Sequence, residues 1–207
     1  MRFVLVSAVL FCLPWCVIDA SAQEDAKNEA VAPAAAESEA ADAERARRQR
    51  LLMGNVAKLE LDGAEFSISY GDTPTDGPDY PQLETLAAGD VVKLTRSIVS
   101  KLKIGRDVKF GDTLLKAGNV AKDYPGVYGL WLKRTDAGWH LVFNEYADVW
   151  GTQYFPEADV AEVPLTFAKT DASVEAYTVT LAEAGEGGSL EITWGEYRWA
   201  AEFTVAR

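Results

Sequence analysis

The acidic and aromatic residues between Asn144 and Glu162 form the group of side chains best suited to chemistry in this sequence. The stretch reads NEYADVWGTQYFPEADVAE and combines the carboxylates Glu145, Asp148, Glu157 and Asp159 with the rings Tyr146, Trp150, Tyr154 and Phe155. Glycosidases move protons with paired carboxylates, and sugar-binding proteins stack aromatic rings on sugar faces. The candidate ligand-binding residues are therefore Asn144, Glu145, Asp148, Trp150 and Tyr154, on a loop that follows a strand.

The same composition supports a second interpretation, in which solvated acids surround aromatic side chains that close one end of a β-fold. We favour this closing role, rank ligand binding second and glycoside hydrolysis third. A second acidic loop, Gly71 to Pro81, carries three prolines and three acids. Loops of that kind can close over a ligand, although most only connect two strands.

A single histidine, His140, limits the catalytic chemistry available to the chain. A nucleophilic triad needs a hydroxyl or thiol held beside the imidazole, and catalytic zinc usually needs about three protein ligands. We expect His140 to be an ordinary strand residue that faces away from the Trp139 side. The acidic loops lack EF-hand spacing, and no nucleotide-binding fingerprint or hydrolase elbow is present. The sequence therefore assigns no catalytic residue, metal site or cofactor.

Alternating apolar and polar residues predict the strands that must position these side chains. The alternation runs on both sides of Asp62-Gly63, a pair that favours a type I′ hairpin turn. A second hairpin is predicted at the C-terminus, with Gly195-Glu196 as its turn. Further strand candidates lie between the two hairpins: Val91 to Leu94, Ile98 to Ile104, Thr113 to Leu115, Gly126 to Lys133, Trp139 to Asn144, Val160 to Lys169 and Val174 to Ala182. About nine to eleven short strands without a convincing helix predict an all-β, antiparallel β-sandwich of jelly-roll-like form over residues 55–207.

The first 22 residues predict a secretory signal peptide. Arg2 precedes an apolar run from Phe3 to Ile18, and small residues stand just before Gln23. The run is shorter than the about 20 residues that a membrane span needs, so no transmembrane span is expected in the mature chain. The only two cysteines, Cys12 and Cys16, lie in this segment. Trp15 stands where a lipoprotein signal needs a small residue, so we favour release over acylation at Cys16. We expect an exported protein, periplasmic or extracellular.

Residues 23–54 predict a spacer that cannot form a core. The segment is rich in alanine and charge and contains no aromatic residue. Its second half, Ser38 to Met53, contains strong helix formers, so we expect a partly helical or disordered spacer. The net charge of −12 makes nucleic acid a poor partner.

Several short motifs, in order along the chain, resemble a known family. They are LLKAG at 114–118, GVYGLWLK at 126–133, GWHLVFN at 138–144, WGTQY at 150–154 and ADV at 158–160. They resemble the bacterial exported family called domain of unknown function 2911, over Val56 to Arg207. The resemblance implies a secreted all-β domain with no established activity.

The chain departs from that family's pattern in two segments. Family members typically place an arginine and a proline after the early Tyr-Gly, where this chain has Asp72 after Gly71. They also carry a tryptophan, an arginine and a run similar to Thr-Gly-Ala-Asn-Glu. In this chain the segment Ala87 to Ile104 lacks that tryptophan and the Gly-Ala-Asn run. If those polar residues form a pocket in the family, this chain has lost or remodelled it. Asn119 to Gly126 resembles an insertion.

Together these observations favour a non-enzymatic, exported binding or interaction module of the bacterial envelope, with a glycan or a protein as partner. The alternative is a carbohydrate or small-ligand binder, with weak glycoside hydrolysis as its extension, that uses the loop Asn144 to Phe155.

Overall fold

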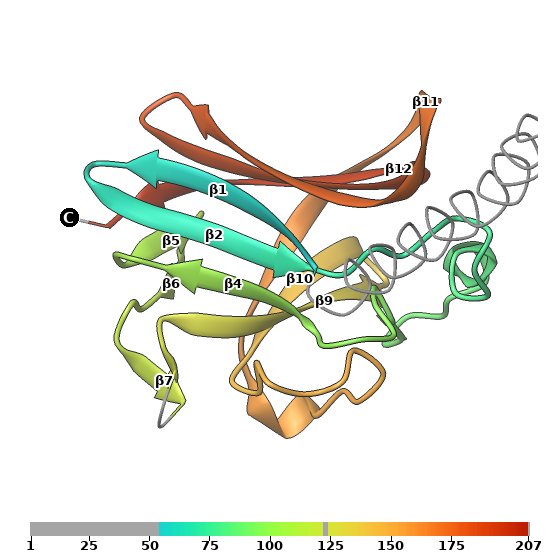
Figure 1. Ribbon diagram of the computed structural model, residues 1–207, viewed down its shortest axis with the longest axis horizontal. Helices are drawn as coiled ribbons and strands as arrows, with labels where there is room; N and C mark the ends of the chain where they lie inside the picture. Colours follow the sequence, from blue (N-terminus) through green and yellow to red (C-terminus); the bar gives the residue numbers. More distant parts are fainter. Residues whose placement is uncertain (1–53, 122–123, 207) are drawn as a thin grey trace, which may run out of the picture. The chain divides into compact units, whose positions relative to one another are not determined.

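One antiparallel β-sheet accounts for most of the structure, a computed structural model that describes residues 54–121 and 124–206 (Figure 1). The strand order is β1-β2-β4-β9-β10-β11-β12-β5-β6, with β3 paired to β9. The strands of this sheet are β1 (Asn55–Leu61), β2 (Ala64–Tyr70), β3 (Val91–Val92), β4 (Ser100–Ile104), β5 (Val108–Phe110), β6 (Thr113–Leu115), β9 (Val127–Thr135), β10 (Gly138–Asn144), β11 (Asp159–Ala184) and β12 (Gly187–Val205). The predicted all-β, antiparallel class is confirmed. The predicted signal peptide, the spacer up to residue 53 and the helix from Ser38 to Met53 lie outside the described residues.

Four short elements lie outside the large sheet. β7 (Asn119–Ala121) and β8 (Tyr124–Pro125) pair with each other and occupy the stretch that resembles an insertion. Of two 3-10 turns, η1 (Pro81–Glu84) begins at the last residue of the acidic loop Gly71 to Pro81, and η2 (Pro156–Ala158) lies in the loop between β10 and β11. Within residues 54–121 and 124–206, no helix has the length and apolar character needed to cross a bilayer.

The large sheet coils, so that its first strands lie against its last ones and enclose the core. β1 and β2 lie beside β11 and β12 in Figure 1, and β1 and β2 both contact β11. Phe66 of β2 and Phe203 of β12 have ring centroids 5.7 Å apart, and Phe110 lies 5.3 Å from both Phe143 and Phe203. The inward-facing residues of both ends of the sheet therefore share one interior, as the alternating pattern predicts.

The hairpin predicted at Asp62-Gly63 is confirmed. Both residues have positive φ, 50° and 72°, as a type I′ turn requires, and Leu61 pairs with Ala64 directly across it. The turn fixes the register of β1 against β2, which places Phe66 and Ile68 in the core.

The hairpin turn predicted at Gly195-Glu196 is wrong. The chain turns at Gly185-Glu186, and β12 continues through Gly195 while it pairs with β11. β11 likewise joins the two strand candidates that the sequence separates, with register shifts between Lys169 and Thr178. The pairing of the two strands shifts register beside Gly195, and an ion pair joins Glu191 to Arg198 of β12.

Close approach of Tyr80 explains the glycine at position 195. A Cβ atom there would overlap the Tyr80 ring, and the Glu196 N–H donates to Tyr80 Oη at 3.2 Å. Gly195 also has φ 60°, which favours glycine. A glycine that leaves room for another side chain within a strand cannot be told from a turn glycine by the sequence alone.

Candidate functional site

The loop between β10 and β11 covers part of the outer face of the sheet. Trp131 and Val142 are buried on that face, and Tyr154 of the loop packs against them. The rings of Trp131 and Tyr154 have centroids 5.2 Å apart. Tyr154 therefore packs against the outer face of the sheet, and the role of closing one end of the fold stays a prediction.

Asn144, the first candidate ligand-binding residue, is bonded within this loop. Its side chain is 1% exposed, and its Nδ2 donates to the Phe155 carbonyl and to Asp159 Oδ1, both at 2.8 Å. Its Oδ1 accepts a hydrogen bond from the Tyr146 N–H at 2.8 Å. The amide therefore holds the two ends of the loop together.

Tyr154 is the second candidate that supports the loop from within. Its hydroxyl donates to Asp159 Oδ2. Burial raises the pKa of Tyr154, and the hydrogen bond and charge of Asp159 raise it further. The phenol consequently remains a protonated donor at neutral pH. A ligand role for Asn144 and Tyr154 stays a prediction.

Trp150 differs from Asn144 and Tyr154 because it points to solvent. It is 54% exposed, and it forms an isolated β-bridge with Ile98, which is also exposed. The backbone on both sides is fixed, because the Gly151 N–H donates to the Ser97 carbonyl at 2.7 Å and the Val99 N–H to the Val149 carbonyl at 2.9 Å. A rigid backbone thus presents the tryptophan ring.

The remaining candidates lie near this tryptophan in the chain. Asp148 forms an ion pair with Lys101 of β4, and Glu145 is half-buried with its N–H bonded to the Ala158 carbonyl. We call Ile98, Lys101, Asp148 and Trp150 the Trp150 patch. Ile98 and Lys101 also line a groove of about 350 Å³, whose other walls include Ser69, Gly71 and Ser97.

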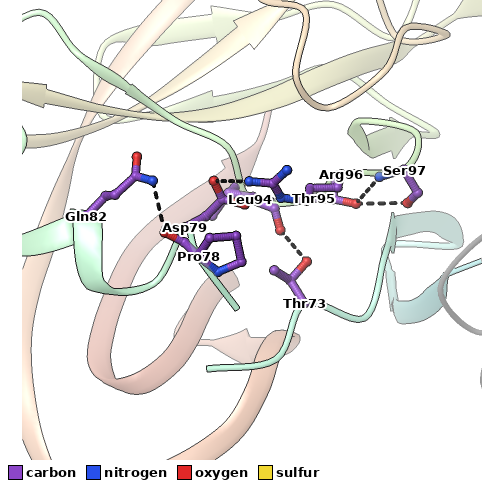
Figure 2. Close-up of polar contacts among 8 residues, drawn as sticks. All are labelled: Thr73, Pro78, Asp79, Gln82, Leu94, Thr95, Arg96 and Ser97. Atoms are coloured by element: carbon purple, nitrogen blue, oxygen red, sulfur yellow. Dashed lines mark hydrogen bonds and ion pairs between the residues drawn. The ribbon is translucent and has the colours of Figure 1, made fainter. Parts of the chain in front are cut away.

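A polar network fixes the segments beside this groove (Figure 2). Thr73 Oγ1 donates to the Leu94 carbonyl at 2.6 Å. Arg96 binds the buried carboxylate of Asp79 through two hydrogen bonds, of 2.6 and 3.0 Å. Two charged hydrogen bonds in a planar fork give a strong and directional contact. The acidic loop Gly71 to Pro81 is therefore tied to the segment Leu94 to Ser97, and Asp79 serves as an anchor.

The sequence did not single out Thr73, Asp79 or Arg96. One signal was available, because Thr73 follows directly on the first departure from the family pattern and Arg96 lies in the second. The structure brings those two segments together, since a Cβ atom on Gly71 would lie 2.6 Å from Thr95 Oγ1. Neither segment alone indicates this contact.

His140 lies on the outer face of the sheet, as expected from the alternation. Trp139 is in the core, whereas His140 Nδ1 lies 2.7 Å from Glu162 Oε1. Lys133 Nζ donates to the other carboxylate oxygen of Glu162 at 2.9 Å. Burial disfavours the charged form of Glu162, but its hydrogen bonds with Lys133 and His140 outweigh that effect, so the pKa of Glu162 is lowered.

The lowered pKa predicts a pH-dependent cost for Glu162→Gln. A carboxylate with a lowered folded-state pKa adds stability above its unfolded pKa, about 4.3, and loses it as the pH falls through the folded value. The variant should therefore melt below the parent protein at pH 7, and the difference should shrink below about pH 4. Thermal melts across pH measure it. Glu157→Gln, at an exposed carboxylate, should show no such trend; a constant deficit for Glu162→Gln would contradict the linkage.

Metal binding finds no support in the described ranges. No group of three or more histidine, cysteine, aspartate or glutamate side chains there is placed to hold a metal ion. Two acids of the β10–β11 loop contact protein groups, since Asp148 pairs with Lys101 and Asp159 accepts from Asn144 and Tyr154.

The fold and site define a class: an antiparallel β-sheet protein whose outer face is covered by an aromatic loop that exposes one tryptophan. A family model described as "Protein of unknown function (DUF2911)" matches residues 55–203, and the chain belongs to that family. The resemblance seen in the sequence is thereby confirmed. Searches of curated proteins and of solved structures each gave no match.

Proposed function

We propose that this protein is an exported, non-enzymatic binding module of the bacterial envelope that takes a carbohydrate at the Trp150 patch. The observation that carries the proposal is the exposed ring of Trp150. Tryptophan is normally well buried, and an exposed ring on a rigid backbone is suited to contact a partner. Export is supported by the pattern of the first 22 residues.

A carbohydrate fits the chemistry around the ring. The apolar face of a sugar stacks on an aromatic ring, and sugar hydroxyls need charged or polar partners at its edge. Lys101 and Asp148 supply a cation and a carboxylate within the same patch, and Ser69 and Ser97 line the adjoining groove. The patch thus offers a stacking surface with donors and acceptors beside it.

Glycan binding by the purified chain tests this function. On an array of bacterial envelope glycans, we expect binding that Trp150→Ala weakens at least about tenfold, since a stacked ring contributes on the order of 1.4 kcal/mol. Trp150→Phe keeps a ring and should retain part of the affinity. Leu114→Ala, at a residue 43% exposed outside the patch, is the matched control.

Three results would contradict the proposal. An array without binding, or equal binding by the parent protein and Trp150→Ala, would remove the carbohydrate site. Cleavage of a bound glycan that disappears in Asp148→Asn would replace the binding module with a weak hydrolase. Melting temperatures of all variants, measured in parallel, show that a lost signal is not lost folding.

A further inference from the structure

A row of aromatic rings is open to solvent at one end of the core. Trp139 of β10, Phe167 of β11 and Tyr197 of β12 lie side by side, with ring centroids 6.0 Å apart at each step. Trp139 and Tyr197 are buried, whereas Phe167 is 39% exposed. An aromatic ring on the inward-facing side of a strand is expected to be covered, so this exposure marks a place where the interior is accessible.

The rings form the floor of a groove of about 470 Å³. Leu83 and Glu84 of η1, together with Leu86, line one part of it, and Arg134 and Lys169 line another. This volume falls within the roughly 300–1,000 Å³ of sites that bind small molecules. The groove shares no lining residue with the Trp150 patch.

The two cations of the groove differ in their partners. Lys169 Nζ lies 3.1 Å from Glu84 Oε1 and 2.8 Å from Glu196 Oε1, so two carboxylates already balance its charge. The guanidinium of Arg134 lies over Trp139, 5.5 Å from the ring centroid. Among the residues that the structure describes, this guanidinium makes no hydrogen bond or ion pair. Five N–H donors of a half-buried guanidinium are thus available to a ligand.

We infer that this groove binds a small planar aromatic carboxylate, with the ligand ring against Phe167 and its carboxylate on the guanidinium of Arg134. A flat ring adds to the row by offset stacking, and the planar fork of arginine matches a carboxylate through two parallel hydrogen bonds. A ligand with a single negative charge is favoured, because the carboxylate of Glu84 lines the groove and the charge of Lys169 is already balanced by two carboxylates. The inference is independent of the carbohydrate proposal.

Titration of the purified chain with 2-naphthoate, followed by NMR of ¹⁵N-labelled tryptophan, tests the inference. We expect the Trp139 indole signal, assigned with Trp139→Phe, to shift on binding. The neutral analogue 2-naphthamide should bind at least about tenfold more weakly, because it has the same ring without the charge. Arg134→Gln should cost at least about tenfold in naphthoate affinity, and Arg134→Lys an intermediate amount, because it keeps the charge without the fork.

Matched variants distinguish binding in the groove from binding elsewhere on the protein surface. Arg106→Gln removes an exposed arginine outside the groove, and Trp150→Ala removes the proposed sugar contact; both should leave naphthoate binding unchanged. Phe167→Leu keeps an apolar side chain but removes the ring, and should weaken binding without loss of folding. Equal affinity for the amide, unchanged affinity in Arg134→Gln, or no Trp139 shift at about 10 mM naphthoate would each overturn the inference.

Discussion

Replacing Trp199 with alanine is expected to lower the free energy of unfolding by about 3–5 kcal/mol. The side chain is fully buried, and its ring lies 5.3 Å from that of Trp139 and 5.8 Å from that of Tyr197. The substitution removes this apolar contact and leaves a cavity among rigid rings, which cannot collapse to fill it. Urea denaturation of the purified chain measures the change.

Trp150→Ala provides a control of identical chemistry. Because Trp150 is mostly exposed, its loss should change the free energy of unfolding by no more than about 0.5 kcal/mol. Similar losses for the two variants would mean that Trp199 does not lie in the interior. The contrast therefore tests the placement of the aromatic core directly.

Gly195→Ala is expected to destabilise the fold by at least about 2 kcal/mol. Alanine is disfavoured at φ 60°, and its Cβ would displace the Tyr80 ring. That ring packs 5.4 Å from Trp194 and 5.6 Å from Tyr197, so its displacement opens the core beside Gly195. Urea denaturation is again the measurement.

Gly185→Ala separates the two causes of the destabilisation expected for Gly195→Ala, which are the positive φ and the overlap with Tyr80. Gly185 has φ 57°, but nothing lies within 4 Å of an added Cβ atom, so only the backbone term of about 1 kcal/mol applies. Gly195→Ala combined with Tyr80→Ala should cost less than the sum of the single changes, because the overlap disappears with the ring. Additive costs would show that Tyr80 is not the reason for the glycine.

Local pattern was sufficient for most of the strands. Alternation located the strand Thr113–Leu115 at its observed bounds, and Asp62-Gly63 indicated the first turn correctly. The error at Gly195 arose because a glycine with positive φ serves a turn and a close contact equally well. The contact is made by Tyr80, which is far away in the sequence, and no local window contains it.

The candidate site was harder to predict than the fold. The sequence grouped Asn144, Tyr154 and Trp150 in one loop, but a loop has no periodicity that tells an inward side chain from an outward one. Only Trp150 of these three is exposed. Nothing in the sequence indicated Arg134 as a binding residue. Whether its guanidinium is free to bind a ligand depends on where carboxylates from distant segments lie.

The placement of β11 bears on how the molecule comes apart. Its first residues hydrogen-bond to β10 and the rest to β12, whose end pairs with β5. β11 and β12 thus join the strands from β1 to β10 in the sheet order to β5 and β6. If β11 and β12 detach from their neighbours, the whole interior is exposed to water at once. Neither the strands before β11 in the sheet order nor β5 and β6 can then persist as a partly folded intermediate. Denaturation in a single cooperative step is the natural consequence of this connection.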